Sequence, residues 1–160
     1  MFVKFDKLPD TARVWIYQAS TLLTDQQKKV IEGSAEEFCG QWAAHGTPLQ
    51  SSFKVLHDKF LVLAVDEGFN MASGCSIDSS VRFMQMLEQK LGISFFDRTQ
   101  VAFLINEQIF TADLKEIKTE IGSGKIDEET LTFNMQAQSL GEFNENWLVP
   151  AGNSWMKRYF

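Results

Sequence analysis

Cys75 is the residue with the clearest chemical potential in this sequence. It lies within residues 71–80, a stretch rich in small and hydroxyl-bearing residues that leads into a predicted helix. A cysteine beside a helix N-terminus is close to the positive end of the helix dipole and to free backbone N–H groups, and both favour the thiolate. Cys75 is therefore a candidate nucleophile or redox-sensing thiol. The alternative, and the commoner case for a cysteine, is a small apolar residue that only packs.

Two neighbouring charges act on this thiol in opposite directions. The carboxylate of Asp78 would disfavour the thiolate, whereas the guanidinium of Arg82, one helical turn later, would offset that effect. Neither His45 nor His57 is close to Cys75 in the sequence. A pair of cysteine and histidine would therefore depend on the tertiary structure.

The same stretch is also a candidate site for a small anion such as phosphate or a carboxylate. Free backbone N–H groups at a helix N-terminus bind anions, and the serine hydroxyls would add donors. A structural alternative exists, because Asp78 and Arg82 are four residues apart and would form an ordinary ion pair on a helix surface. The candidate ligand-binding residues are Ser73, Gly74, Ser76, Asp78, Ser79 and Arg82.

Residues 122–125 (GSGK) resemble the end of a phosphate-binding P-loop but lack the rest of the pattern. A P-loop has a glycine five residues before its last glycine, and a serine or threonine after the lysine. Thr119 and Ile126 occupy those two positions, and a predicted helix precedes the segment instead of a strand. We therefore expect no P-loop ATPase, and we interpret the two glycines as a helix end and a turn.

The overall composition is that of an acidic, folded protein without a cofactor motif. The chain has 160 residues, of which 44% are hydrophobic and 22% charged, with a net charge of −6. This charge argues against nucleic-acid binding, which requires a basic surface. The two cysteines give neither a disulfide framework nor a metal motif. No run approaches the roughly 18 apolar residues that cross a bilayer, and no signal peptide is evident, so we expect a cytoplasmic protein.

The pattern of apolar residues predicts an alternation of strands and helices. Residues 60–65 (FLVLAV) are apolar at every position, which is typical of a strand buried on both faces. Thr24 and Gln27 form a predicted capping box at the start of the first long helix. The predicted strands are 13–19, 52–56, 60–66, 100–105, 108–111 and 130–133, and the predicted helices are 24–44, 77–91 and 112–121.

This order predicts an α+β fold of the ferredoxin-like type. The elements up to residue 105 read β-α-β-β-α-β, which gives an antiparallel sheet backed by two helices if the crossovers are right-handed. We assign this core to residues 1–105. Residues 106–160 are predicted to form a small C-terminal β/α appendage that packs on the core.

Aromatic residues indicate where a partner would contact this fold. Arg13, Trp15 and Tyr17 share one face of the first strand, as in sheets that stack RNA bases, but the neighbouring strand offers only Phe60. We therefore expect the appendage, rather than RNA, to cover that face. Trp147 and Trp155 in the appendage are the candidate partner-binding residues.

Two resemblances to known families extend this interpretation. The first is carried by residues 13–19 (RVWIYQA), residues 72–83 (ASGCSIDSSVRF) and the ending with Trp147, Pro150 and Trp155. Together they resemble a family of short uncharacterised bacterial proteins. Some members of that family are labelled "ABC transporter ATPase", but this sequence has neither a P-loop nor an LSGGQ-like signature. The resemblance implies no particular activity.

The second resemblance covers roughly residues 103–155. Residues 110–117 (FTADLKEI) and 124–133 (GKIDEETLTF) are similar to the GYF-like domains, which act as peptide-binding adaptors. The Gly-Tyr-Phe signature itself is absent. This resemblance implies a GYF-like fold for the C-terminal region.

The sequence as a whole favours a cytoplasmic binding or interaction protein. Its partner is expected to be either a protein segment, held by the aromatic C-terminal region, or a small anion at residues 73–80. The alternative is a thiol-dependent enzyme or redox sensor that uses Cys75. No metal, other cofactor, nucleic acid or membrane is expected to bind.

Overall fold

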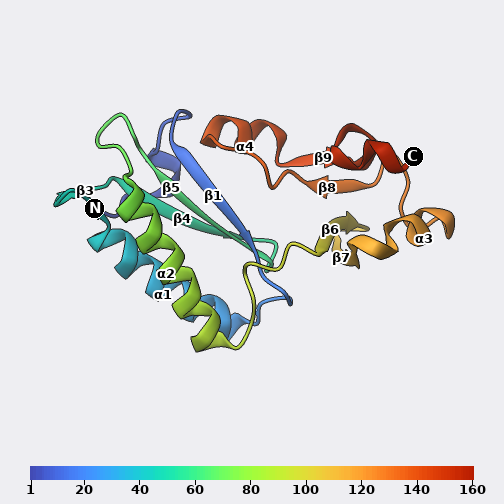
Figure 1. The fold of residues 1–160 in the computed structure, drawn as a ribbon, viewed down its shortest axis with the longest axis horizontal. Coiled ribbons are helices and arrows are strands. Elements are labelled where there is room, and N and C mark those ends of the chain that lie inside the picture. Colours follow the sequence, from blue (N-terminus) through green and yellow to red (C-terminus); the bar gives the residue numbers. More distant parts are fainter.

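The computed structural model describes residues 1–160 and has an α+β fold with two main antiparallel sheets (Figure 1). The first sheet has the order β1-β5-β4, with β1 at Arg13–Gln18, β4 at Ser51–Leu56 and β5 at Phe60–Val65. No residue of β5 is accessible to solvent, which confirms the prediction of a strand buried on both faces. A small additional sheet pairs β2 (Ala43–Ala44) with β3 (Thr47–Pro48).

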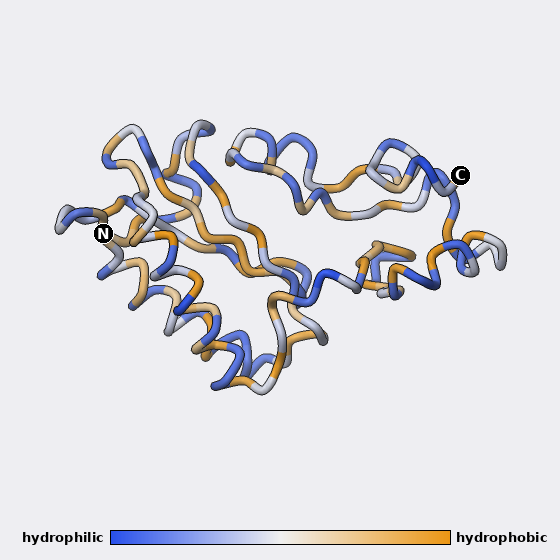
Figure 2. The backbone as a smooth tube through the Cα atoms, in the orientation of Figure 1, coloured by the Kyte–Doolittle hydropathy of each residue, from blue (hydrophilic) through white to orange (hydrophobic).

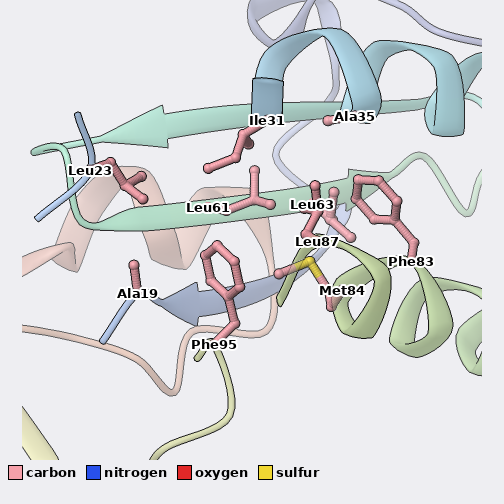
Figure 3. Close-up of a cluster of buried hydrophobic side chains, with 10 residues drawn as sticks. All are labelled: Ala19, Leu23, Ile31, Ala35, Leu61, Leu63, Phe83, Met84, Leu87 and Phe95. Carbon is pink, nitrogen blue, oxygen red and sulfur yellow. The ribbon is translucent and has the colours of Figure 1, made fainter. Parts of the chain in front are cut away.

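Two long helices, α1 (Asp25–Gln41) and α2 (Gly74–Leu91), cover one face of the first sheet (Figure 1). The Thr24 side chain accepts a hydrogen bond from the Gln27 N–H, so the predicted capping box is confirmed. Apolar side chains of the two helices and β5 point toward one another in the core between them (Figure 3). This cluster comprises Ala19, Leu23, Ile31, Ala35, Leu61, Leu63, Phe83, Met84, Leu87 and Phe95.

The opposite face of the first sheet packs against the chain's two ends. Val14, Val62 and Ala64 contact Leu140 and Phe143 of helix α4 (Leu140–Asn146). The short 3-10 helix η1 (Phe5–Lys7) flanks the same cluster. Figure 2 shows that the strands of this sheet are mainly apolar, whereas α1 and α2 combine apolar with hydrophilic residues. The sheet is therefore buried on both faces, as a strand like β5 requires.

The second sheet has the order β7-β6-β8-β9 and belongs to the C-terminal half of the chain. A core of Phe103, Ile117, Ile126 and Met156 lies against it. An aromatic cluster around Phe60 and Phe133 joins the two sheets. The remaining elements are β6 (Gln100–Ile105), β7 (Gln108–Asp113), η2 (Leu114–Glu116), α3 (Ile117–Gly122), β8 (Leu131–Phe133), β9 (Leu148–Pro150), η3 (Ala151–Asn153) and η4 (Trp155–Tyr159).

The strand predicted to complete a ferredoxin-like sheet lies elsewhere. The first sheet has the expected order of the first three strands, but β6 pairs with β7 and β8 instead of β1. The complete ferredoxin-like order is therefore not confirmed. The predicted boundary after residue 105 falls between β6 and β7, which are hydrogen-bonded neighbours.

Two predicted helix boundaries are wrong. The predicted helix 112–121 begins only at Ile117, because Ala112 still pairs with Val101 in the β6–β7 hairpin and is buried there. The helix predicted from residue 77 begins at Gly74, because the side chain of Ser73 caps it three residues earlier than expected. This second difference places Cys75 inside the first helical turn.

Candidate functional site

The predicted anion site at residues 73–80 comprises the N-cap and the first two turns of α2, and the serine side chains in it are bonded to neighbouring groups. The Ser73 hydroxyl accepts a hydrogen bond from the Ser76 N–H (3.1 Å), and the Ser76 hydroxyl accepts one from the Ser73 N–H (2.7 Å). The carbonyl of Ser76 accepts a hydrogen bond from the buried indole N–H of Trp42. Ser73, Gly74 and Ser76 therefore begin and anchor the helix.

The other predicted residues of this site continue the same local network. The Ser79 hydroxyl donates to the carbonyl of Cys75 (3.0 Å) and accepts from Arg82 (3.0 Å). Asp78 is exposed and forms no ion pair with Arg82. Ser79 is thus the partner of the one cation that would attract an anion here.

The two cysteines differ strongly in accessibility. Cys75 is exposed, and no hydrogen bond joins it to His45 or His57. Cys39 is buried under the first sheet, and burial raises the pKa of its thiol to about 11. Of the two thiols, only Cys75 is open to a reagent, and no general base is bonded to it.

The two predicted partner-binding tryptophans have different environments. Trp147 packs against Phe60, Phe133 and Phe143, with ring centroids 4.9, 5.1 and 4.9 Å away. It contributes to the cluster that joins the two sheets, although its indole N–H is buried without a hydrogen-bond partner. Trp155, in contrast, is 41% exposed. Of the pair, it is Trp155 that presents its ring to solvent.

Trp155 lines a cleft of about 1000 Å³ between β1 and the C-terminal half of the chain. One wall is β1, from Val14 to Gln18. The other walls come mainly from residues 95–102, residues 132–138 and η4, and Val81 and Leu114 complete the lining. A volume of this size, with mainly apolar walls, is typical of ligand-binding clefts in proteins.

Aromatic rings form a part of the apolar lining of this cleft. Phe96 is 40% exposed and packs edge-on against Tyr17 of β1, with ring centroids 5.7 Å apart. Tyr17 is partly buried, and this burial raises the pKa of its hydroxyl. Trp155 stands on the C-terminal side. Exposed aromatic rings of this kind are the side chains that most often anchor a partner.

The charged groups of the cleft are mainly positive, although the whole chain carries −6. Arg98 and Arg158 line it, and neither forms a salt bridge. The one acidic group is Asp97, which accepts hydrogen bonds from the N–H (2.9 Å) and hydroxyl (2.6 Å) of Thr99. These bonds lower the pKa of Asp97. Arg158 donates one hydrogen bond to the Tyr159 hydroxyl (3.2 Å) and stacks on its ring, whereas Arg98 has no hydrogen-bond partner. Neither guanidinium is neutralised by a carboxylate, so both attract a carboxylate from outside, and Arg98 is the less occupied of the two.

Sequence reasoning did not find this cleft, although it identified some of its residues. The sequence indicates Trp155 as a partner-binding residue, and it places Tyr17 on a face of the first strand that the appendage is expected to cover. Phe96 and Arg98 were missed, although an aromatic and a basic residue in a short polar connection are a weak signal for a surface site. The cleft itself depends on how the two halves of the chain pack together.

No group of three or more His, Cys, Asp or Glu side chains is placed to hold a metal ion. None of the helices combines the length and apolar composition needed to cross a membrane. Comparison of the chain with protein-family models, with curated proteins and with solved structures found no match. The geometry of the molecule is therefore the basis for assigning a function.

Proposed function

We propose that this protein is a binding protein whose partner is a segment of another protein, held in the cleft between β1 and the C-terminal half. The observation that carries the proposal is the exposure of Phe96 (40%) and Trp155 (41%) on a mainly apolar cleft of about 1000 Å³. Aromatic residues in a cleft contribute much of the binding energy in protein interfaces. The proposal needs no catalytic group.

The cleft is a better candidate binding site than residues 73–80, where a small anion was the alternative ligand. The serine hydroxyls of that turn are already bonded to neighbouring groups, and Arg82 already donates to Ser79. Of the backbone N–H groups in this turn, only those of Gly74 and Cys75 are open to an anion, and the hydroxyls would have to exchange their present bonds to help bind it. The first sheet with its two helices, taken as an incomplete ferredoxin-like unit, leaves its β1 side facing the cleft.

A second candidate function rests on the exposure of Cys75. An accessible thiol in the first turn of a helix suits a redox sensor, which must react with small oxidants. Both cysteines are free, which fits a reducing compartment such as the cytoplasm. A thiol enzyme would also need a base near the sulfur, and no such group is hydrogen-bonded to Cys75.

The test of the binding proposal is a selection of linear peptides from a displayed random library on the immobilised protein. Selected peptides should bind Trp155→Ala and Phe96→Ala at least about tenfold more weakly than the wild type, since each ring is a binding anchor. Phe69→Ala is the matched control, because Phe69 is 53% exposed but does not line the cleft.

The control variant should bind as well as the wild type, and all three variants should melt near the wild-type temperature. If no peptide is enriched, or if the enriched peptides bind Trp155→Ala and Phe96→Ala as tightly as the wild type, the cleft is not the binding site.

A further inference from the structure

The outer edge of β1 is open over most of its length. On its inner side β1 pairs with β5 from Arg13 to Gln18. On its outer side it pairs only at its beginning, where the Val14 N–H donates to the Gln138 carbonyl (3.1 Å) and the Leu140 N–H donates to the Ala12 carbonyl (2.8 Å). Past this short contact no strand lies beside β1 in the sheet.

The alternation of an antiparallel strand identifies which backbone groups are left without a partner. The N–H and C=O groups of one residue point to the same side, and those of the next residue point to the other. Because the Val14 N–H points outward, the groups of Ile16 and Gln18 also point outward. No backbone hydrogen bond outside the regular elements involves either of these two residues.

These free groups open into the cleft. Val14, Ile16 and Gln18 all line it, and the open edge ends where the Gln18 side chain donates to the Gln100 carbonyl (3.2 Å). At about 3.3 Å per residue, the edge from Val14 to Gln18 is about 13 Å long, which matches about four residues of an added strand. The place vacant beside β1 is the one that the fourth strand takes in a ferredoxin-like sheet.

An open edge is a liability in a soluble protein unless it is protected or used. Here the walls of the cleft limit access, so a folded sheet is a poor fit, whereas a single extended chain can enter. The side chains of such a chain would alternate between the Tyr17 and Phe96 side and the Val14 and Ile16 side of β1. Both sides are apolar.

The charges at the cleft indicate the chemistry of the segment. Arg98 and Arg158 have no salt-bridge partner and line the same cleft, whereas Asp97 is held by Thr99. An acidic side chain or a C-terminal carboxylate in the incoming segment would be attracted to the two arginines. A basic segment would instead be repelled.

We infer that the cleft binds an extended, apolar and acidic segment of a partner protein by strand addition. In this mode the segment forms hydrogen bonds with the free backbone groups of Ile16 and Gln18 and becomes a fourth strand beside β1. The inference rests on the proposed function, because it specifies how the partner segment is held in the cleft.

The test uses synthetic versions of the peptides enriched in the selection, each carrying one backbone N-methyl group at successive positions. In an added strand, only alternate peptide amides donate to β1. Methylation of those amides should therefore weaken binding by about two- to tenfold each, the loss expected for one hydrogen bond. Methylation of the amides between them should have a smaller effect.

A second measurement detects the same hydrogen bonds from the side of the protein and needs no substitution. When peptide is added, hydrogen exchange of the Ile16 and Gln18 amides should slow markedly, because both become donors to the peptide. The charge requirement is tested with Arg98→Glu and Arg158→Glu, each expected to weaken binding of acidic peptides by about tenfold. Lys118→Glu is the control for a change of charge outside the cleft.

The possible failures can be told apart. Peptides that depend on Trp155, yet show no alternating effect of N-methylation and no protection of Ile16 and Gln18, would overturn strand addition and leave cleft binding intact. Peptides that are enriched without acidic residues and bind equally to both arginine variants would overturn the acidic partner. A free protein that is a dimer in light scattering, with Ile16 already protected, would show that a second copy fills the edge.

Discussion

The first turn of α2 and the outer edge of β1 both present backbone groups to the surface, but side chains cap part of these groups at α2 and none of them at β1. The N–H groups of Gly74 and Cys75 are the ones left open at α2. At α2, Ser73 and Ser76 bond reciprocally and Ser79 holds Arg82. At β1, the groups of Ile16 and Gln18 have no partner from another segment. A polar group satisfied within its own turn stabilises the fold, whereas a polar group left open beside a cleft can bind a partner.

The comparison also shows why residue type alone is a poor guide to a binding site. The turn at α2 is rich in serine and includes a cysteine, so it attracts notice in the sequence. The edge of β1 consists of ordinary strand residues. Its binding capacity lies in backbone atoms that every residue except proline has, and it depends on which neighbours are missing.

The largest expected effect comes from the strand that supports the cleft from inside. Val62 of β5 is completely buried and pairs with Ile16. Val62→Asp would bury a charge without a partner and should destabilise the fold by about 4 kcal/mol or more. Circular dichroism should show loss of the cooperative melting transition. A soluble variant that melts like the wild type would mean that the first sheet is misplaced.

The next largest effect is expected at the first turn of α2, and it tests whether this turn stabilises the fold instead of binding a ligand. Ser73→Ala removes the hydroxyl that accepts from the Ser76 N–H and should lower the free energy of unfolding by about 1 kcal/mol. The measurement is urea unfolding, with Asp78→Asn as the control because Asp78 makes no hydrogen bond or ion pair. Peptide binding should be unchanged in Ser73→Ala, and a loss of binding would move the site to this turn.

The Lys59 side chain differs from the free groups of the cleft, because it is buried and is expected to lower the stability of the fold. The Lys59 side chain is 2% exposed and has no ion-pair partner, and burial lowers its pKa. Lys59→Met should therefore raise the melting temperature at neutral pH by about 2–5 °C.

The sign of the pH dependence follows from the lowered pKa of Lys59. Between this pKa and the ordinary value of 10.5, the unfolded chain binds the proton more strongly than the folded one. The stability of the wild type should therefore rise with pH relative to Lys59→Met, and the advantage of the variant should shrink toward alkaline pH. Paired melting curves at neutral and alkaline pH measure this difference. An advantage that grows with pH would contradict the burial of the ammonium.

The smallest expected effect on stability is at Cys75. The thiol is exposed and forms no hydrogen bond through its sulfur, so Cys75→Ser should change the free energy of unfolding by less than about 0.5 kcal/mol. Mass spectrometry after brief alkylation of the native protein should show Cys75 labelled and Cys39 unlabelled. Labelling of Cys39 under native conditions would mean that the core opens more easily than its burial implies.

The parts of the fold that depend on local sequence patterns could be predicted. The apolar run of β5 and the capping box at Thr24 both appear where the sequence indicates them. The destination of β6 could not be predicted, because residues 100–105 have the same strand pattern whichever neighbour they pair with. Pairing with β7 is a local hairpin around Asn106 and Glu107, whereas pairing with β1 would require closing a loop of about 80 residues.

The cleft was out of reach of sequence reasoning for a related reason. Tyr17, Phe96 and Trp155 are brought together only because β6 joins the second sheet and leaves the side of β1 open. With β6 predicted in the first sheet, the edge of β1 is covered and no cleft is expected. The wrong pairing of β6 with β1 is therefore the reason why neither the free backbone groups nor the aromatic residues around them are predicted as a site.

The most direct test of the open edge is residue-resolved hydrogen exchange of the free protein along β1. The N–H groups of Trp15 and Tyr17 face β5, while those of Ile16 and Gln18 face the cleft. Exchange at Ile16 and Gln18 should be faster by at least on the order of a hundredfold, since amides without a partner need no opening of the sheet. Uniformly slow exchange from Trp15 to Gln18 would show that the edge is already covered and would contradict strand addition at this cleft.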